Sequence, residues 1–167
     1  RWPGGLAYVN ILAAMFFGAI SGSAAAAAAA IGAFITPLME KEGYDTNYSA
    51  SVNITSATTG LLIPPSNILI VYSLASGGVS IAALFIAGYL PGILVGLLLM
   101  VVAGIIAVKK GYRGSNERYT FKQGIMCFLD ALPSLMLIVI VIGGIIAGFF
   151  TATEGSAIAV LYTFILS

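Results

Sequence analysis

The amino-acid sequence predicts an all-α membrane protein, a polytopic helical bundle with a re-entrant helical hairpin and a broken transmembrane helix. Of its 167 residues, 60% are hydrophobic and 8% are charged, whereas soluble domains carry roughly a quarter of their residues charged. Charged residues are absent from residues 2–39, 46–108 and 131–153. Each run exceeds the roughly 20 apolar residues that cross a bilayer core. A soluble single-domain enzyme is therefore not expected.

Charge and composition argue against further classes. The net charge is +1 and His is absent, so neither a basic surface for nucleic acid nor a Cys/His metal cluster is expected. Cys127 is the only cysteine, and no disulfide can form within the chain. Because the chain begins with Arg1 rather than Met and ends at Ser167 inside an apolar stretch, we expect a piece of a longer protein.

Residues 1–39 predict the re-entrant hairpin. The run breaks naturally at Ser21-Gly22-Ser23, which leaves two arms of about 15 residues, or about 23 Å of helix each. Such arms fall short of a membrane core about 30 Å thick. A hairpin whose tip lies near mid-membrane is therefore favoured over two short, tilted spans.

Residues 46–76 predict the broken transmembrane helix. Proline lacks an N–H and clashes with the preceding turn, so a helix from about Thr46 must break at Pro64-Pro65. A second, shorter helical piece is expected from Ser66 onward. The two pieces together make one crossing of the membrane.

Residues 80–108 predict an unbroken transmembrane helix, and residues 109–131 predict a basic cytoplasmic loop with an interfacial helix. Five of the seven basic residues lie between 109 and 122, which places this stretch in the cytoplasm by the positive-inside rule. From Ser115 to Asp130, charged and apolar residues mix as in an amphipathic helix on a membrane surface. Two crossings separate residues 40–45 from this loop, so both are expected on the same side.

Residues 132–167 predict a further membrane helix, to about Phe150, and the start of another. Thr151 and Glu154 have the spacing of a capping box, in which each side chain accepts a hydrogen bond from the other's backbone N–H. Regularly spaced glycines favour close helix packing. They are Gly88, Gly92, Gly96, Gly144 and Gly148.

The hairpin tip is the first candidate for chemistry. A helix that ends near Ile20 leaves its last carbonyls without helical partners at the negative end of the helix dipole, which suits a small cation. The next helix begins at Ser23, a good N-cap, and its free N–H groups suit an anion. The alternative is a tight Gly/Ser turn that only packs against neighbouring helices.

The broken helix is the second candidate. Pro64 and Pro65 cannot donate to the carbonyls of Gly60 and Leu61, and the nearby segment 53–59 supplies hydroxyls. Carbonyl and hydroxyl oxygens can hold a hard cation such as Na+ without a buried carboxylate. The alternative is a proline kink whose polar groups satisfy one another. A hairpin tip and a broken helix in one chain are typical of secondary transporters.

An enzyme is not expected. Ile20-Ser21-Gly22 lies near the pattern of an intramembrane serine protease, but such enzymes need a base, usually His, to activate the serine. The sequence contains no His. A phosphate-cradling G-x-x-x-x-G-K-[ST] motif is also absent, so nothing in the chain hydrolyses a nucleotide to drive transport.

The ordered motifs resemble the large membrane subunit of tripartite ATP-independent periplasmic (TRAP) transporters. The segments that carry the resemblance are GGLAYVNILAAMFFGAISGSAAAAAAAIGAF, EKEGYD, SATTGLLIPPSNILIVYSLASGGVSIAALFIAGYLPG and ALPSLMLIVIVIGGIIAGFFTATEGSAIAVLY. They cover nearly the whole chain, and the last resembles the start of that subunit's second inverted repeat. The resemblance implies an elevator-type, ion-coupled transporter architecture, with Na+ as the coupling ion and no other cofactor.

The resemblance also implies partners, a location and a site. It implies import of an organic acid, such as sialic acid or a dicarboxylate, across the bacterial inner membrane. A periplasmic substrate-binding protein delivers this carboxylate, and a small membrane subunit, separate or fused, flanks the large one in the lipid bilayer. The implied Na+ and substrate residues are Ser21, Gly22, Ser23, Thr58, Thr59, Gly60, Pro64, Pro65 and Ser66. The Na+ candidates among them are Ser21, Ser23, Thr58 and Gly60.

One departure from the family bears on the substrate. Many dicarboxylate-type members carry an Asp in the helix after the Ser-Gly-Ser tip, whereas residues 24–30 here are all alanine. This departure weakens the assignment of a four-carbon dicarboxylate as the substrate and leaves sialic acid or another sugar acid open. Two other functions stay open: an Na+- or H+-coupled carrier that works without a binding protein, and a non-transporting membrane scaffold.

Overall fold

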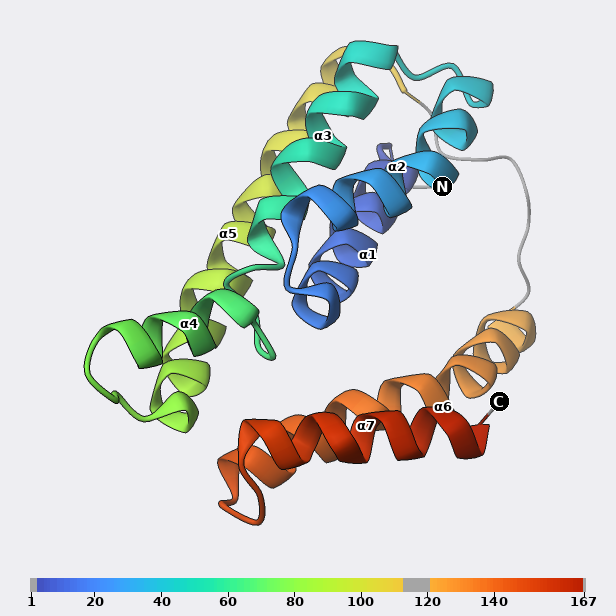
Figure 1. Cartoon of the computed structure of the whole chain (residues 1–167). Helices are drawn as coiled ribbons and strands as arrows, with labels where there is room; N and C mark the ends of the chain where they lie inside the picture. Colours follow the sequence, from blue (N-terminus) through green and yellow to red (C-terminus); the bar gives the residue numbers. More distant parts are fainter. Residues whose placement is uncertain (1–2, 113–120, 167) are drawn as a thin grey trace. The chain divides into compact units, whose positions relative to one another are not determined.

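A computed structural model describes residues 3–112 and 121–166. Every regular element in these residues is a helix, which confirms the predicted fold class (Figure 1). The helices are α1 (Gly5–Ser21), α2 (Ala24–Lys41), α3 (Thr46–Thr59), α4 (Asn67–Ala75), α5 (Ile81–Lys109), α6 (Phe121–Ile146) and α7 (Ala152–Leu166). They form two compact units, α1 to α5 in the first and α6 with α7 in the second.

The helices α1 and α2 form a hairpin that turns at Gly22. This glycine has a φ of +62°, a left-handed value that residues with a Cβ rarely adopt. Its N–H donates to the carbonyl of Gly18 at 2.8 Å and closes the end of α1. Ser23 then caps α2, because its hydroxyl accepts a hydrogen bond from the N–H of Ala26 at 3.3 Å. The predicted helix break at Ser21-Gly22-Ser23 is confirmed.

The length of the hairpin arms does not decide whether they cross the membrane. The arms have 17 and 18 residues, somewhat more than the about 15 expected from the sequence. Within the described residues, three helical segments are long and apolar enough to span a membrane, namely α2, α5 and residues 125–146 of α6. The re-entrant arrangement therefore stays a prediction.

The helices α3 and α4 are the two pieces of the broken helix. The Asp45 carboxylate caps α3 by accepting a hydrogen bond from the N–H of Tyr48 at 3.0 Å. Non-helical residues 60–66, the unwound segment, separate the end of α3 at Thr59 from the start of α4 at Asn67. The interruption predicted from the two prolines is therefore present. It begins one turn before them because a proline ring clashes with the carbonyl four residues earlier.

The first turns of α5 pack against the unwound segment through two glycines. A methyl group built on Gly88 would lie 2.5 Å from the carbonyl oxygen of Leu62. One built on Gly92 would lie 2.6 Å from Cγ1 of Ile63. Neither position has room for a side chain, so the backbones approach as small residues allow in membrane helices.

The later turns of α5 pack in the same way against α1. Gly96 faces the end of the Met15 side chain, and Gly104 faces the hydroxyl of Tyr8, so closely that a methyl group at either position would displace the facing side chain. The predicted packing role of Gly88, Gly92 and Gly96 is thus confirmed. The hairpin covers only part of α5, and in Figure 1 α4 lies beside the first turns of α5 beyond the hairpin tip.

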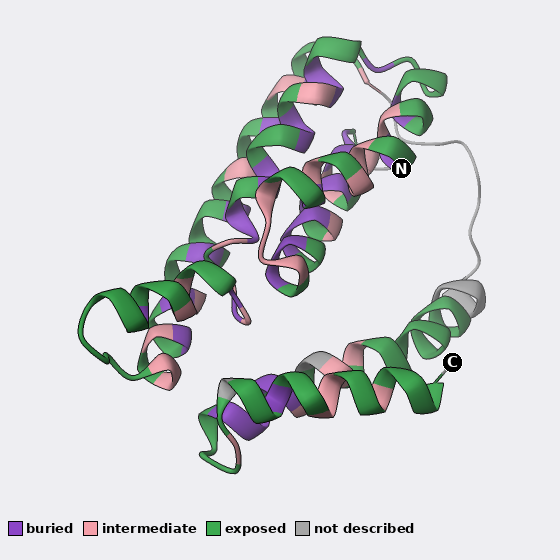
Figure 2. Cartoon of the chain, in the orientation of Figure 1, coloured by how far each residue is buried: buried purple, intermediate pink, exposed green. Residues whose placement is uncertain are grey.

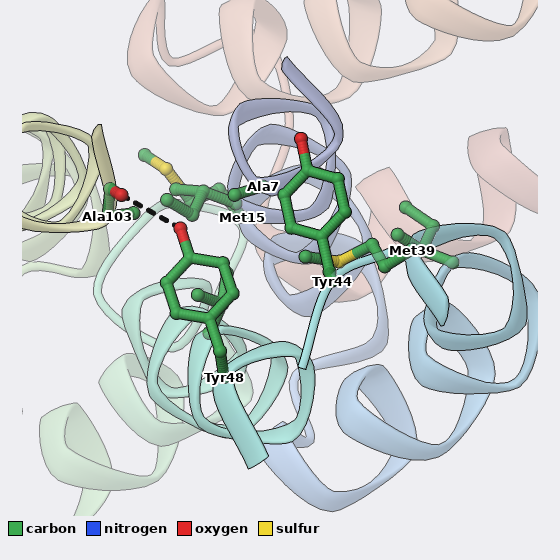
Figure 3. Close-up of a cluster of buried hydrophobic side chains, with 9 residues drawn as sticks. Ala7, Met15, Met39, Tyr44, Tyr48 and Ala103 are labelled. Atoms are coloured by element: carbon green, nitrogen blue, oxygen red, sulfur yellow. Dashed lines mark hydrogen bonds between the residues drawn. The ribbon is translucent and has the colours of Figure 1, made fainter. Parts of the chain in front are cut away.

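A tyrosine cluster joins the α2–α3 turn to the end of α5 (Figure 3). Buried Tyr48 donates a hydrogen bond from its hydroxyl to the carbonyl of Ala103 at 2.8 Å. Tyr44 stacks on Tyr112 with ring centroids 4.5 Å apart, and the Asp45 N–H donates to the Tyr112 hydroxyl at 3.0 Å. Burial raises the pKa of the Tyr44 hydroxyl, so this side chain stays neutral at physiological pH.

The same contacts place the α2–α3 turn beside the start of the basic stretch. The Lys110 Nζ lies 3.8 Å from the Asp45 carboxylate, although such a half-exposed pair contributes little stability. This agrees with the prediction that residues 40–45 and the basic stretch share one side. Residues 113–120 of that stretch lie outside the described residues.

The outward surface of α5 is apolar and exposed. Figure 2 shows burial in the first unit mainly on the faces that the helices turn toward one another. Leu90, for example, is 78% exposed. Soluble monomers rarely expose large continuous apolar patches, whereas membrane helices turn such surfaces to lipid. The other large exposed side chains of α5 are Ile86, Ile93, Leu94, Val95, Leu97, Leu98, Val101, Val102, Ile105 and Val108.

In the second unit, α6 differs from its prediction. The sequence suggests an interfacial helix that ends near Asp130 and a separate span from Leu132, but α6 runs on through Pro133. A helical proline leaves the carbonyl four residues earlier, here that of Leu129, without its usual donor, and membrane helices tolerate this. The hydroxyl of Tyr162 in α7 donates to a different group, the carbonyl of Pro133 itself, at 2.8 Å and links the two helices. Residues 115–120 of the expected interfacial helix lie outside the described residues.

The start of α7 confirms the capping box. The Glu154 N–H donates to Oγ1 of Thr151 at 3.3 Å, and the Thr151 N–H donates to Oε2 of Glu154 at 2.8 Å. Of the two glycines predicted to pack nearby, Gly144 lies against the ring of Phe150. Gly148 instead lies in the turn, where its φ of +76° explains the glycine better than a helix contact does.

Replacing Gly88 by Ala tests the packing of α5. The methyl group has to push the Leu62 carbonyl away, so we expect a loss of about 1–3 kcal/mol in stability, the usual cost of overpacking. Thermal unfolding of the purified full-length protein in detergent measures it. The control is Gly143→Ala in α6, which meets no atom of the described residues within 4 Å. Equal unfolding temperatures for the two variants would contradict the packing.

Candidate functional site

The hairpin tip, Ser21-Gly22-Ser23, lies beside the unwound segment. A methyl group built on Gly60 would lie 2.6 Å from the Cα of Gly18, and one built on Gly18 would lie 2.9 Å from the Cα of Gly60. At the tip itself, a methyl group on Gly22 would lie 2.5 Å from Nδ2 of Asn67. The structure thus brings together the two segments that the sequence predicts to share a site.

Four helix ends meet at this place. The helices α1 and α3 end at Ser21 and Thr59, and α2 and α4 begin at Ala24 and Asn67. Helix C-termini carry partial negative charge on their carbonyls, and N-termini carry partial positive charge on their N–H groups. The site therefore offers oxygen atoms for a cation beside N–H groups for an anion, although nothing in it carries a formal charge.

The two tip serines are held by local hydrogen bonds. The Ser21 hydroxyl donates to the Ser23 carbonyl at 3.3 Å and accepts a hydrogen bond from the Ser23 N–H at 3.3 Å. The Ser23 hydroxyl accepts from Ala26 and keeps its own hydrogen as a donor. All three tip residues are half-buried, so their polar atoms are fixed in place without being sealed off.

The threonine hydroxyls at the end of α3 bond back to their own helix. Oγ1 of Thr58 donates to the Thr55 carbonyl at 2.8 Å, and Oγ1 of Thr59 donates to the Ser56 carbonyl at 2.6 Å. Thr59 is buried and Thr58 is exposed. Each hydroxyl has used its hydrogen, yet each oxygen retains a lone pair that can coordinate a cation. The alternative, a proline kink whose polar groups satisfy one another, therefore describes the hydroxyl hydrogens. The hydroxyl oxygens can still bind a cation.

Ser66 closes the unwound segment from inside. Its hydroxyl donates at 2.6 Å to the carbonyl of Leu61, the acceptor that Pro65 leaves without a helical donor. Ser66 and Pro64 are both fully buried. The Leu61 carbonyl, predicted to be free, is thus occupied. Because the Ser66 hydroxyl turns to Leu61, it makes no capping hydrogen bond to α4 within the described chain.

Two residues outside the predicted set belong to the site. Gly18 makes the backbone contact with Gly60, and Asn67 lies over Gly22. The sequence could have pointed to Gly18, because a glycine one turn before the end of a helix is expected where another backbone approaches closely. It points less strongly to Asn67, whose only distinguishing feature is a polar side chain at the first position of an apolar helix.

A neighbouring pocket does not suit an anion. It has a volume of about 300 Å³ and lies between α1, the unwound segment and α5. Its lining is entirely apolar or aromatic side chains. They are Leu12, Met15, Phe16, Ile63, Tyr89, Ile93, Leu97 and Met100. Because a carboxylate buried there would lose its hydration without gaining a charged partner, the polar helix ends are the better candidate.

Comparison with known proteins assigns the class. The sequence profile of the family described as "Tripartite ATP-independent periplasmic transporter, DctM component" matches residues 1–167. The chain belongs to this family. The family and the apolar helices together make it a multi-pass membrane protein.

Three relatives match nearly the whole length of the chain. The chain is 59% identical over its full length to uncharacterized protein YgiK of Salmonella typhimurium. It is 42% identical, over 96% of its length, to the C4-dicarboxylate TRAP transporter large permease protein DctM of Pseudomonas aeruginosa. It is 39% identical, over 98% of its length, to the sialic acid TRAP transporter large permease protein SiaM of Vibrio cholerae. The latter two are named as permeases, which agrees with the expectation of no enzyme.

The chain corresponds to a part of these relatives. It spans 38% of the length of the Salmonella protein, 37% of the Pseudomonas protein and 38% of the Vibrio protein. The fold and site of residues 1–167 therefore describe one portion of a permease subunit of this kind.

Replacing Ser66 by Ala tests the unwound segment. The change removes the side-chain donor from the partly buried Leu61 carbonyl, which costs about 1 kcal/mol. Thermal unfolding of the full-length protein in detergent measures the loss. Ser51→Ala is the matched control, because its exposed hydroxyl makes a similar bond to the Asn47 carbonyl. Similar unfolding temperatures for the two variants would contradict the internal role of Ser66.

Proposed function

We propose that this chain is part of the large permease subunit of a TRAP transporter that imports an organic acid with Na+ as the coupling ion. The observation that carries the proposal is the contact of α1 with the unwound segment at Gly18 and Gly60, one turn before the hairpin tip. The family match supports the transporter class.

The proposed Na+ position lies at the C-terminal ends of α1 and α3. Ser21 and Thr58 supply hydroxyl oxygens there, Ser23 caps the neighbouring helix, and Gly60 supplies a backbone carbonyl. Two helix dipoles point their negative ends at this position, and oxygen ligands suit a hard cation. Thr59, buried beside Gly60, would hold the end of α3 rather than face the ion.

The proposed carboxylate position lies at the N-terminal ends of α2 and α4. Serine side chains cap α2 and α5, and Asp45 caps α3, whereas within the described chain α4, like α1, lacks a side-chain cap. The first N–H groups of α4 can therefore donate to an anionic group. Pro64 and Pro65 hold the unwound segment open, and Gly22 lets the Asn67 amide approach the tip. An ion bound beside this position would stabilise the geometry in which the carboxylate binds.

The arrangement along α5 supports a re-entrant hairpin. The contacts of α1 with α5 run from Gly104 to Gly96, and the unwound segment then packs against Gly92 and Gly88. The hairpin ends there, while α4 accompanies the remaining turns of α5. The tip thus lies short of one end of a helix that is long enough to cross the membrane. The hairpin and the broken helix are packed together. We therefore also propose that they move as one body, which is an elevator mechanism.

The family also supports the location and partners that we propose. The subunit would lie in the bacterial inner membrane, with the basic residues 109–122 in the cytoplasm. A small membrane subunit would flank it, and a periplasmic binding protein would deliver the substrate. The substrate class is an organic acid, because relatives are named for C4-dicarboxylate and for sialic acid at similar identity.

A non-transporting scaffold is the second candidate. It is favoured by the hydroxyls of Thr58, Thr59 and Ser66, each of which already donates to a carbonyl of its own segment. A scaffold needs these bonds and nothing more, whereas a transporter also needs the oxygen lone pairs. The two functions differ in what happens when a hydroxyl is removed without unfolding the protein.

We therefore expect Ser21→Ala, Ser23→Ala and Thr58→Ala to lower Na+-dependent uptake while membrane expression stays intact. Each change removes one proposed oxygen or its support, so a rise of roughly tenfold in the Na+ concentration for half-maximal uptake is expected from the loss of one charge-assisted contact. Uptake by proteoliposomes that contain the complete transporter measures it, with Ser51→Ala as the control. Normal Na+ dependence in all three variants would favour the scaffold.

Omitting the binding protein separates the proposal from a carrier that works alone. Uptake of the organic acid into proteoliposomes is measured with and without the purified periplasmic protein at the same Na+ gradient. We expect uptake to fall to background without it, because delivery depends on that partner. Unchanged uptake would identify an Na+- or H+-coupled carrier of a different kind.

A further inference from the structure

Asn53 joins the second arm of the hairpin to the broken helix. Its Nδ2 donates to the carbonyl of Ala28 in α2 at 2.7 Å, and its side chain is almost fully buried, with 6% exposed. The other hydrogen bond between these helices, from Thr46 Oγ1 to Glu40 at 3.0 Å, lies at their exposed far end. Asn53 therefore makes the buried link on the side of the hairpin tip.

Gly32 makes this link sterically allowed. In a helix, the side chain of residue i+4 lies over the carbonyl of residue i, so the Ala28 carbonyl is open only because residue 32 has no side chain. A methyl group built on Gly32 would lie 2.5 Å from Nδ2 of Asn53. The asparagine amide thus occupies the space that a side chain at position 32 would fill.

Only the donor half of the amide is used. The Asn53 Oδ1 is buried and has no hydrogen-bond partner among the described residues. A buried acceptor without a donor is unfavourable, and an apolar side chain would avoid it. The donated bond to Ala28 is therefore the contact that accounts for a polar residue at position 53.

We propose that Asn53 is a positioning residue that fixes α2 against α3 and thereby sets the hairpin tip against the unwound segment. Ala28 follows Ser23 by about 8 Å of helix, and Asn53 precedes Thr59 by about 9 Å, at 1.5 Å per residue. Sliding of α2 along α3 would move Ser23 relative to Thr59 by the same amount. The effect on ion binding rests on the proposed Na+ site, whereas the effect on the tip does not.

The first experiment measures the tip directly by amide hydrogen exchange of residues 21–26 in the purified full-length protein without Na+. We expect exchange to be roughly three- to tenfold faster in Asn53→Ala, the range that one hydrogen bond supports. Exchange of residues 152–166 should not change. The matched control is Asn47→Ala, an exposed asparagine at the start of the same helix. Unchanged exchange of the tip in Asn53→Ala would overturn the proposal.

A double-mutant comparison guards against simple unfolding. Gly32→Ala alone should speed exchange of the tip, because the methyl group displaces the Asn53 amide. Added to Asn53→Ala, the same change should have no further effect, because the group that it displaces is gone. Additive effects of the two changes on exchange would overturn the proposed contact. This criterion also applies if each single change destabilises the protein.

Uptake measurements distinguish this proposal from the proposed function. We expect Asn53→Ala to raise the Na+ concentration for half-maximal uptake by a similar roughly three- to tenfold, with the maximal rate retained. Faster exchange of the tip together with Na+-independent uptake by the wild-type protein would overturn Na+ coupling and leave the positioning role supported. An unaltered Na+ requirement in Asn53→Ala, where wild-type uptake depends on Na+, would overturn the positioning of the ion site.

Discussion

The contact between the backbones of Gly18 and Gly60 is the constraint on which the candidate site depends. No side chain fits between these two residues, so the end of α1 and the end of α3 approach as closely as two chains can. Among the described residues, no backbone hydrogen bond joins the two segments at this point. The contact results from packing of small residues, the interaction that remains when lipid offers no hydrophobic drive for helix association.

This contact explains how a chain with few charges can form a polar site. Each helix that stops inside the bundle exposes polar backbone groups, and α1 to α4 all start or stop at the same place. Side chains then decide which of these backbone groups are hydrogen-bonded and which stay free. Ser23 caps α2, whereas Ser66 turns away from α4 to the Leu61 carbonyl. The first N–H groups of α4 consequently differ from those of α2, which is the asymmetry expected of a site for an anion.

The sequence predicts the helix breaks well because their causes are local. A glycine in a left-handed turn and a proline without an N–H act on the backbone within one turn, and the breaks at Gly22 and before Pro64 are both present. Pro37, Pro91 and Pro133 have the same chemistry, yet each lies inside an unbroken helix. A single proline therefore does not decide a break, whereas the adjacent prolines 64 and 65 coincide with one.

Pairings between distant segments are the part that the sequence does not predict. Gly18 meets Gly60, and Gly32 receives Asn53, yet nothing near either glycine specifies its partner. The spaced glycines of α5 indicate packing without indicating that two of them face the unwound segment. The family resemblance implies that the candidate site residues lie together, and the helix packing supplies the physical reason for their proximity.

Direct binding of radioactive Na+ to the purified full-length protein tests the central claim most directly. The comparison is between the wild-type protein, Gly60→Ala, which forces the two backbones apart, and Gly143→Ala, which meets open space among the described residues. The account predicts saturable Na+ binding in the wild type and in Gly143→Ala, and at least a tenfold loss of affinity in Gly60→Ala, about 1.4 kcal/mol. Equal Na+ affinity in all three folded proteins would contradict it.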